Sequence, residues 1–292
     1  MSRIALATYK QLPNLNDDDR LLVAALSKLG ISAVPAVWDS ADVCWDDYQA
    51  VVVRSCWDYH RLLPEFLAWI ARLERDSLAL WNPPALLRWN SHKSYLRDLA
   101  ARGVPIVPTR WLERGHSFEL SELLQQEAWP EAVVKPAVSA SAFGAWSTTL
   151  AGAAASQPRL EALLEAGDVL VQPFMPEVRD AGEWSLMFFA GRFSHAVLKR
   201  PAAGDYRVQW EFGGSAETRT ATRELIEDAE RVLAAVPRGE GEPLYARVDG
   251  VARDGRLVLM ELELIEPHLF LAWDTGAPGR LAAGLHHALA PA

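Results

Sequence analysis

The stretch Val258-Leu-Met-Glu-Leu-Glu-Leu-Ile-Glu-Pro-His268 carries acidic residues inside what is otherwise the pattern of a strand. Side chains alternate between the two faces of a strand, so Met260 and Leu262 share one face while Glu261 and Glu263 share the other. Two carboxylates this close together repel each other, which indicates a raised pKa, a basic partner or a bound hard cation. The alternative is an edge strand whose acidic face lies in water.

The segment Leu244–Val251 precedes this strand and forms the other half of a predicted hairpin. A three-residue loop, Arg253–Gly255, would place Asp249 on the face of Glu261, whereas a two-residue loop would place it on the opposite face. The three-residue loop also places Arg247 opposite Glu261. This register predicts a site for one or two Mg²⁺ ions that carry a polyphosphate, with Mn²⁺ as the alternative metal. The predicted metal ligands are Asp249, Glu261 and Glu263.

The composition is that of an ordinary globular protein, with 50% of the 292 residues hydrophobic and 23% charged. The net charge of −9, without a cluster of Lys and Arg, argues against nucleic acid and favours a small-molecule partner. No apolar run approaches the roughly 20 residues of a membrane span, and the N-terminus enters a strand pattern directly, so we expect no membrane and a cytoplasmic location. Cys44 and Cys56 cannot make a disulfide framework. A homo-oligomer is left open.

Strands alternate with helices in the first part of the chain, which predicts an α/β lobe with a parallel sheet. The expected strands are Arg3–Thr8, Ile31–Val37, Tyr48–Arg54 and Leu78–Trp81, and the expected helices run from Asp17 to Gly30 and over Leu62–Arg75. Ligands bind beyond the carboxyl ends of such strands, so Arg54, Ser55 and Asp58 are predicted to bind the substrate. A polar surface loop anchored by Trp57 is the alternative.

Two lysines are candidates for binding an anion. Ser91 is expected to cap a helix from His92 to Arg102. Lys93 would then lie in the first turn, where a cation opposes the helix dipole unless an anion binds nearby; a solvated lysine is the alternative. A strand over Ala132–Pro136 ends at Lys135. The loop that follows is small and hydroxyl-rich, and its backbone amides and two serines, Ser139 and Ser141, could approach phosphate closely.

The remaining elements complete a mixed α/β chain. The sequence predicts a strand over Asp168–Met175, a hairpin of Glu183–Phe189 with Arg192–Leu198, and an amphipathic helix over Thr222–Val236.

The order of these motifs along the chain is more specific than any one of them. The order is Lys93, Val-Val-Lys135-Pro, a small-residue loop, Val-Gln172-Pro-Phe-Met, a basic segment, then Asp249 and Glu261-Leu-Glu263. Over residues 80–275 this order resembles the ATP-grasp superfamily, and the first lobe resembles the domain that usually precedes the grasp. Many members have Asn where Glu263 stands, so this site is more acidic than usual.

The resemblance implies roles for individual residues. Lys93 and Lys135 would contact the phosphates of ATP, and the backbone near Phe174 and Met175 would hold adenine. Gln172 and Glu177 would flank the nucleotide, and the carboxylates would bind Mg²⁺. The implied lobes are an N-terminal substrate lobe (1–88), a central ATP-grasp lobe (89–174) and a C-terminal ATP-grasp lobe with the metal site (175–292).

Three further segments are similar to the cycloserine-forming cyclo-ligase branch, which closes O-ureido-D-serine. They are Val-Val-Arg54-Ser-Cys-Trp-Asp-Tyr-His, Phe-Ser-His195-Ala-Val-Leu-Lys-Arg-Pro201 and Glu-Leu-Glu-Leu-Ile-Glu-Pro267. This similarity implies a small amino-acid-like substrate, although relatives could act on another acid.

The chemistry implied is ATP-dependent ligation. A substrate carboxylate attacks the γ-phosphate, and an amine then displaces phosphate from the acyl phosphate. Arg200 and Arg207 are the candidate catalytic residues, which would hold the acyl phosphate and its tetrahedral successor. The alternative is that they pair at the surface with Asp205 or Glu211. Two rival functions share the cleft: a nucleotide-binding regulator without ligase activity, and a phosphotransferase.

Overall fold

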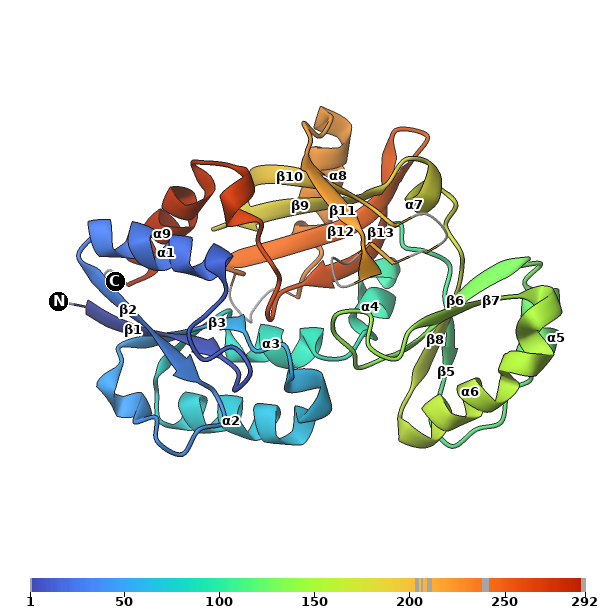
Figure 1. The fold of residues 1–292 in the computed structure, drawn as a ribbon, viewed down its shortest axis with the longest axis horizontal. Helices are drawn as coiled ribbons and strands as arrows, with labels where there is room; N and C mark the ends of the chain where they lie inside the picture. The colour runs from blue at the N-terminus through green and yellow to red at the C-terminus, as the bar shows by residue number, and fades with distance from the viewer. Residues whose placement is uncertain (1, 203–204, 206, 209–211, 238–241, 290–292) are drawn as a thin grey trace.

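The computed structural model describes residues 2–202, 205, 207–208, 212–237 and 242–289. The described strands form three sheets in three parts of the molecule (Figure 1). Within these ranges, no helix is long and apolar enough to cross a membrane.

The N-terminal sheet is parallel, with strand order β2-β1-β3-β4. Its strands are β1 (Ser2–Thr8), β2 (Ile31–Val37), β3 (Ala50–Ser55) and β4 (Ala79–Trp81), and its helices are α1 (Asp17–Lys28) and α2 (Leu63–Arg75). Alternation along β1 sends Ile4 and Leu6 into a core with α1, and Ala5 and Ala7 into a second core with α2. The C-terminal helix α9 (Ala277–Ala288) returns to pack beside α1 (Figure 1).

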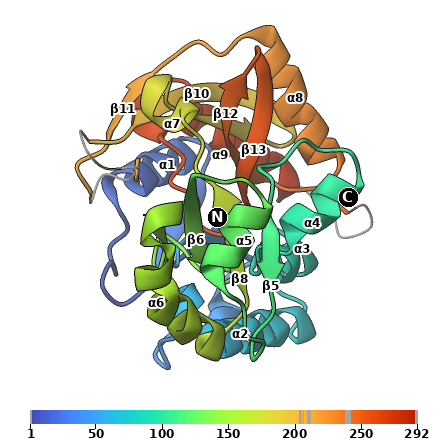
Figure 2. The ribbon, with the colours of Figure 1, turned by 90° about the vertical axis from the view of Figure 1, so that its right-hand side faces the viewer.

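The central sheet is antiparallel, with order β5-β8-β6-β7. Its strands are β5 (Arg110–Leu112), β6 (Glu131–Pro136), β7 (Trp146–Thr149) and β8 (Val169–Pro173), and helices α5 (Leu120–Gln126) and α6 (Ala153–Ala166) pack on it (Figure 2). In β6, Ala132 and Val134 pack against these helices, so Val133 and Lys135 project from the other face.

The C-terminal sheet is also antiparallel, with order β11-β10-β9-β12-β13. Its strands are β9 (Glu183–Phe189), β10 (Arg192–Arg200), β11 (Ser215–Thr218), β12 (Tyr245–Arg253) and β13 (Arg256–Glu263). Helix α8 (Arg223–Ala234) packs on one face through Leu225, Ala229 and Val232. The charged side chains described below project from the other face.

The predicted start of the helix over residues 92–102 is wrong. The structure has two short helices, α3 (Pro84–Asn90) and α4 (Tyr95–Ala101), and Lys93 lies in the turn between them. Ser91 closes α3 instead of starting a helix, because its hydroxyl donates to the carbonyl of Arg88 (2.7 Å). The two helices are tied to β13: Asn90 exchanges hydrogen bonds with Leu262 and Leu264, and the Tyr95 hydroxyl accepts from the Leu262 amide.

The prediction of a three-residue hairpin loop is also wrong. Arg253 pairs with Arg256, so the turn contains only Asp254 and Gly255, with φ of 52° and 76°. Two left-handed residues are what a tight two-residue hairpin turn requires. The face on which Asp249 lies is therefore decided elsewhere in the hairpin.

Candidate active site

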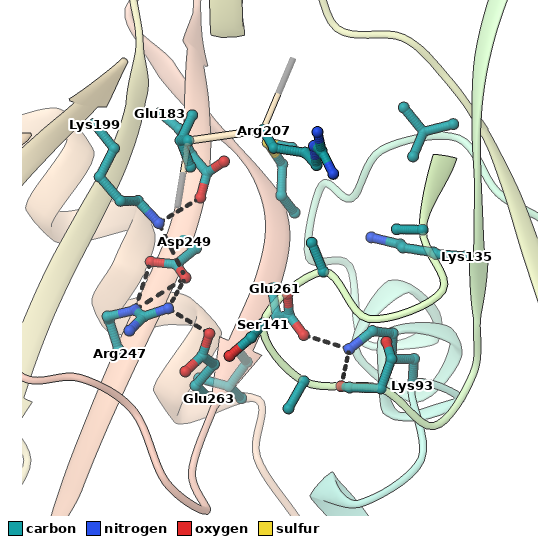
Figure 3. Close-up of a pocket in the computed structure, with 18 of the residues that line it drawn as sticks. Lys93, Lys135, Ser141, Glu183, Lys199, Arg207, Arg247, Asp249, Glu261 and Glu263 are labelled. Atoms are coloured by element: carbon teal, nitrogen blue, oxygen red, sulfur yellow. Dashed lines mark hydrogen bonds and ion pairs between the residues drawn. The ribbon is translucent and has the colours of Figure 1, made fainter. Parts of the chain in front are cut away.

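A pocket of about 580 Å³ lies where the central and C-terminal sheets approach each other, a volume typical of a small-ligand site. Its walls come from β6 and β8 of the central sheet, from β9, β10, β12 and β13 of the C-terminal sheet, and from the segments that precede α4 and follow β13. Figure 3 shows charged side chains from both sheets converging on this space.

A β-bulge on β13 brings the three predicted carboxylates together. The pairing is regular from the turn to Gly250 opposite Leu259, and then shifts so that Asp249 lies opposite Glu261. Met260 is thus the extra residue of the bulge. It returns Asp249 to the face of Glu261, whereas a two-residue turn without a bulge would have placed Asp249 on the opposite face. Gly250 is required here, because a Cβ atom at this position would lie 2.5 Å from the carbonyl oxygen of Val258. Asp249, Glu261 and Glu263 all line the pocket.

Arg247 binds two of these carboxylates (Figure 3). The register places it opposite Glu263, not opposite Glu261 as expected from the sequence. Its guanidinium contacts Asp249 at 2.8 Å and also donates to Glu263. Lys199 Nζ approaches Asp249 at 3.6 Å and Glu183 at 2.6 Å. The result is a buried network in which acids and bases alternate.

The pKa values of the two glutamates on β13 move in opposite directions. Burial, reinforced by Asp249 and Glu261, raises the pKa of Glu263 to about 7 despite the nearby Arg247. Burial acts on Glu261 in the same sense, but Lys93 and then Lys135 hold the pKa of Glu261 below its usual value. The two neighbouring glutamates therefore differ in how readily they take up a proton, Glu263 more readily than Glu261.

The two predicted lysines both line the pocket (Figure 3). Lys93 donates to Glu261 and to the carbonyl of Ser139 (3.2 Å). No acidic partner lies within ion-pair distance of Lys135 in the described chain, and burial lowers its pKa to about 8. A half-buried cation that lacks a counterion in the described chain is a natural site for a phosphate.

The loop after β6 borders the same space. Ser139 and Ser141 line the pocket, as do Ala140 and Ala142 between and after them. Ser141 and Ala142 have φ of 49° and 55°, a left-handed conformation that is uncommon for residues other than glycine.

Residues at the end of β8 form the apolar part of the pocket. Phe174 and Met175 line it, together with Val107, Val178 and Met260. Gln172 also lines it and donates to the hydroxyl of Thr109 (2.8 Å). Glu177 does not line the pocket: it begins α7 (Glu177–Asp180) and pairs with Arg253. The expected contact of Glu177 with the nucleotide stays a prediction.

The two predicted catalytic arginines differ in position. Arg207 lines the pocket, is close to Lys135 in Figure 3, and pairs with Asp205 at 2.8 Å. Arg200, at the end of β10, does not line the pocket and pairs with Glu217 at 2.7 Å. Of their expected alternative partners, Asp205 is one of Arg207's neighbours, and Glu211 lies outside the described residues.

None of the three predicted substrate residues, Arg54, Ser55 and Asp58, lines the pocket, although Trp57 and Tyr59 of the same loop do. Arg54 is only 1% exposed and pairs with Asp19 at 2.9 Å, and Ser55 also donates to Asp19. Asp58 accepts from the indole of Trp38 (2.9 Å). The carboxyl end of β3 is covered by the segment after β13, because Arg54 donates to the carbonyl of Pro267.

Several lining residues were missed by sequence reasoning. Glu183 and Lys199 pair across β9 and β10. Each interrupts an apolar strand pattern, which is the signal that could have identified them. Glu266 and His268 follow the acidic strand and also line the pocket. No periodicity applies beyond the strand end, so the sequence could not assign them a face.

The donor chemistry of the acidic face fits a hard divalent cation, although the side chains must move to bind one. As they lie, no three Asp, Glu, His or Cys side chains in the described part of the chain are close enough together to hold a metal. Arg247 donates hydrogen bonds to both Asp249 and Glu263, and Lys93 donates one to Glu261. The oxygens of Glu261 and Glu263, whose side chains are 31% and 25% exposed, are more accessible than those of Asp249 at 3%. All three offer the oxygen ligands that Mg²⁺ prefers.

Comparison with known proteins agrees with this architecture. Residues 4–82 match the family described as D-cycloserine synthetase DcsG, N-terminal domain. The whole chain aligns with the whole of the cycloserine biosynthesis protein DcsG of Streptomyces lavendulae, at 32% identity over 300 residues. A glutathione synthetase of Prochlorococcus marinus (strain MIT 9313) is 35% identical over 176 residues, which cover 58% of this chain and 52% of the relative.

Solved structures show the same fold. The crystal structure of D-cycloserine synthetase DcsG matches with a TM-score of 0.90 and 30% identity, over 99% of this chain and 100% of that one. A D-alanine–D-alanine ligase from Bacillus anthracis, complexed with ATP, matches with a TM-score of 0.72 and 17% identity, over 99% and 97%. The fold and the relatives define an ATP-grasp ligase. Within that class, the chain belongs to the family of the cycloserine biosynthesis protein DcsG. The predicted superfamily, fold class and branch are thereby confirmed.

Proposed function

We propose that this chain is an ATP-dependent carboxylate–amine ligase or cyclo-ligase, which acts on a small amino-acid-like substrate through an acyl phosphate and releases ADP and phosphate. The observation that carries the proposal is the convergence, in one pocket, of a lysine with no acidic partner among the described residues, an apolar recess and an acidic hairpin. The full-length similarity to DcsG supports the substrate class.

ATP would bind with its adenine ring at the apolar part of the pocket and its phosphates near the lysines. The apolar side chains around Phe174 and Met175 suit the adenine ring, and Gln172 offers a polar contact beside it. Lys93 and Lys135, with the loop containing Ser139 and Ser141, would then contact the phosphates. The γ-phosphate would lie beside the acidic face.

Glu261 and Glu263 would hold one or two Mg²⁺ ions, with Mn²⁺ as the alternative. Asp249 would join them only by exchanging part of its contact with Arg247 for the metal. A bound Mg²⁺ offsets negative charge on the transferring phosphoryl group.

The chain's own residues then serve two bond-forming steps. In the first, a carboxylate oxygen of the substrate attacks the γ-phosphorus and the bond to ADP breaks, while Lys135 stabilises the phosphoryl charge. In the second, an amine nitrogen attacks the acyl carbon, phosphate leaves with the electron pair of the carbon–oxygen bond, and the nitrogen loses a proton. Arg207, whose guanidinium reaches the pocket, is placed to bind the oxyanion of this step. Arg200 has no direct part from its present position.

The test is product analysis with O-ureido-D-serine as the first substrate, ATP and Mg²⁺. A ligase releases ADP and phosphate together with a cyclised or amide product. A phosphotransferase would accumulate a phosphorylated acid, and a regulator would bind ATP without ADP release. A screen of other amino-acid analogues, with and without an added amine, follows if this compound is inactive. The absence of ADP release throughout the screen would refute the proposal.

A further inference from the structure

Glu266 differs from the other acids that line the pocket. Glu183, Asp249, Glu261 and Glu263 each pair with a lysine or arginine. The carboxylate of Glu266 has neither an ion pair nor a hydrogen bond to another side chain within the described residues. It is nevertheless only 9% exposed. A carboxylate that is taken out of water without a partner is costly, which indicates that a cation completes this site when the pocket is filled.

The backbone that carries Glu266 is held in place by three side chains. Trp57 donates its indole N–H to the carbonyl of Glu266 (3.1 Å), and Arg54 donates to the carbonyl of Pro267 (2.9 Å). Arg247 donates to the carbonyl of His268 (3.0 Å). Three consecutive carbonyls are thus held from two lobes, which fixes the backbone from which the Glu266 side chain projects.

The surroundings of Glu266 suit an organic cation. Trp57, Phe270 and Trp273 line the same pocket. An acid stabilises an ammonium group through a charged hydrogen bond, and aromatic rings in the same pocket add the attraction of their negative faces. A fully hydrated Mg²⁺ would gain less from such rings, and the proposed metal ligands lie within β12 and β13, whereas Glu266 follows the end of β13.

We propose that Glu266 binds the ammonium group of the amino-acid substrate and is a specificity-determining residue for an amine next to the reacting carboxylate. This inference rests on the proposed function, since it assigns one end of the substrate to a side chain of the same pocket. The structure assigns Trp57 and Arg54 to positioning: they hold the carbonyls of Glu266 and of the next residue, Pro267.

The experiment compares two ligands with two proteins. Calorimetry would measure the affinity of O-ureido-D-serine, and of the same molecule with hydrogen in place of its α-amino group, in the presence of Mg²⁺ and a non-hydrolysable ATP analogue. The wild-type protein should bind the amine at least tenfold more tightly than the analogue without it. Glu266→Gln, which has the same shape without the charge, should bind the two compounds almost equally. Glu65→Gln, at an exposed position on α2, is the matched control and should keep the wild-type preference.

Two results would overturn the inference: no preference for the amine in the wild-type protein, or a preference that persists in Glu266→Gln. A third would be weaker binding of the Mg²⁺–nucleotide complex in Glu266→Gln, which would assign the residue to the metal. ADP release is measured separately. Binding with the expected preference but without turnover would refute the proposed ligase reaction and leave the ammonium site standing.

Discussion

Arg54 Nη2 donates a hydrogen bond of 2.9 Å to the carbonyl oxygen of Pro267, which lies 213 residues later in the chain. The same guanidinium pairs with Asp19 through Nε at 2.9 Å, and both side chains are 1% exposed. This arginine therefore joins the first parallel sheet to the segment that leads out of the acidic hairpin.

We expect Arg54→Met to lower the free energy of unfolding by about 3–5 kcal/mol, because it leaves the Asp19 carboxylate buried without its partner. Urea denaturation measures this loss. Arg20→Met, at an exposed pair with Asp17, is the control and should change stability by less than about 0.5 kcal/mol. If the Arg54→Met protein were fully stable and failed only to bind the acid, Arg54 would be a direct substrate contact and not a structural residue.

Lys135 should make ATP binding depend on pH. Burial lowers its pKa to about 8, so the lysine is charged below pH 8 and neutral above it. A phosphate gains most from the charged form, and we expect ATP affinity to fall as the pH rises through about 8. Calorimetry from pH 7 to 9.5 measures this fall. Lys135→Ala should weaken ATP binding by about 1–3 kcal/mol at pH 7, with the fold intact, and should lack this pH dependence. An identical pH profile in the variant would refute the assignment.

The two glutamates of β13 should respond differently to neutralisation. Glu261→Gln and Glu263→Gln should each nearly abolish Mg²⁺-dependent turnover. The pKa of Glu263 is raised to about 7, so its stabilising contribution is complete below its unfolded value near 4.5 and is lost as the pH rises to 7. Glu263→Gln should flatten this part of the stability–pH curve.

The pKa of Glu261 is lowered instead, by its neighbours Lys93 and Lys135, so its contribution is present at neutral pH and is lost on acidification. Glu261→Gln should therefore destabilise the protein at pH 7, because Lys93 loses its partner. Thermal denaturation of both variants between pH 4 and 8 compares them. Parallel curves for the two variants would contradict the assignment.

Substitution of Gly250 should reduce stability and turnover more than substitution of Gly255 by Asn, although both glycines lie in the hairpin. Gly250→Ala places a Cβ atom 2.5 Å from the carbonyl oxygen of Val258 and disturbs the bulge that sets Asp249 opposite Glu261. We expect a loss of stability of about 1–3 kcal/mol and impaired turnover.

Gly255 has open space around its Cα but a φ of 76°. Gly255→Asn, which tolerates this conformation, should leave turnover unchanged, whereas Gly255→Val should strain the turn. Denaturation and ADP release for all three variants test this order. A more severe effect of Gly255→Asn than of Gly250→Ala would show that the turn, not the bulge, sets the register.

Local periodicity determined much of the fold. The apolar run at Ala50–Val53 and the regular spacing in α2 and α8 place those elements within one or two residues of their observed bounds. The expected strand Ile31–Val37 is reproduced in full. The alternation that puts Glu261 and Glu263 on one face is likewise a property of the strand itself, and the order of motifs identified the superfamily.

Tertiary structure decided what local patterns leave open. The bulge at Met260 depends on the pairing of two strands. It places Asp249 on the face of Glu261, as expected, but the cause is the bulge and not the predicted three-residue loop. Arg54 was expected at the rim of a sheet, because the sequence of β3 does not show that a segment more than 200 residues away covers that rim. Burial and the identity of a charged partner are properties of distant contacts. The sequence therefore indicated part of the pocket lining, including Lys93, Lys135 and the three carboxylates of the hairpin, whereas the tertiary structure decided that Glu183, Lys199 and Arg247 pair with the others while Glu266 is left to face the pocket.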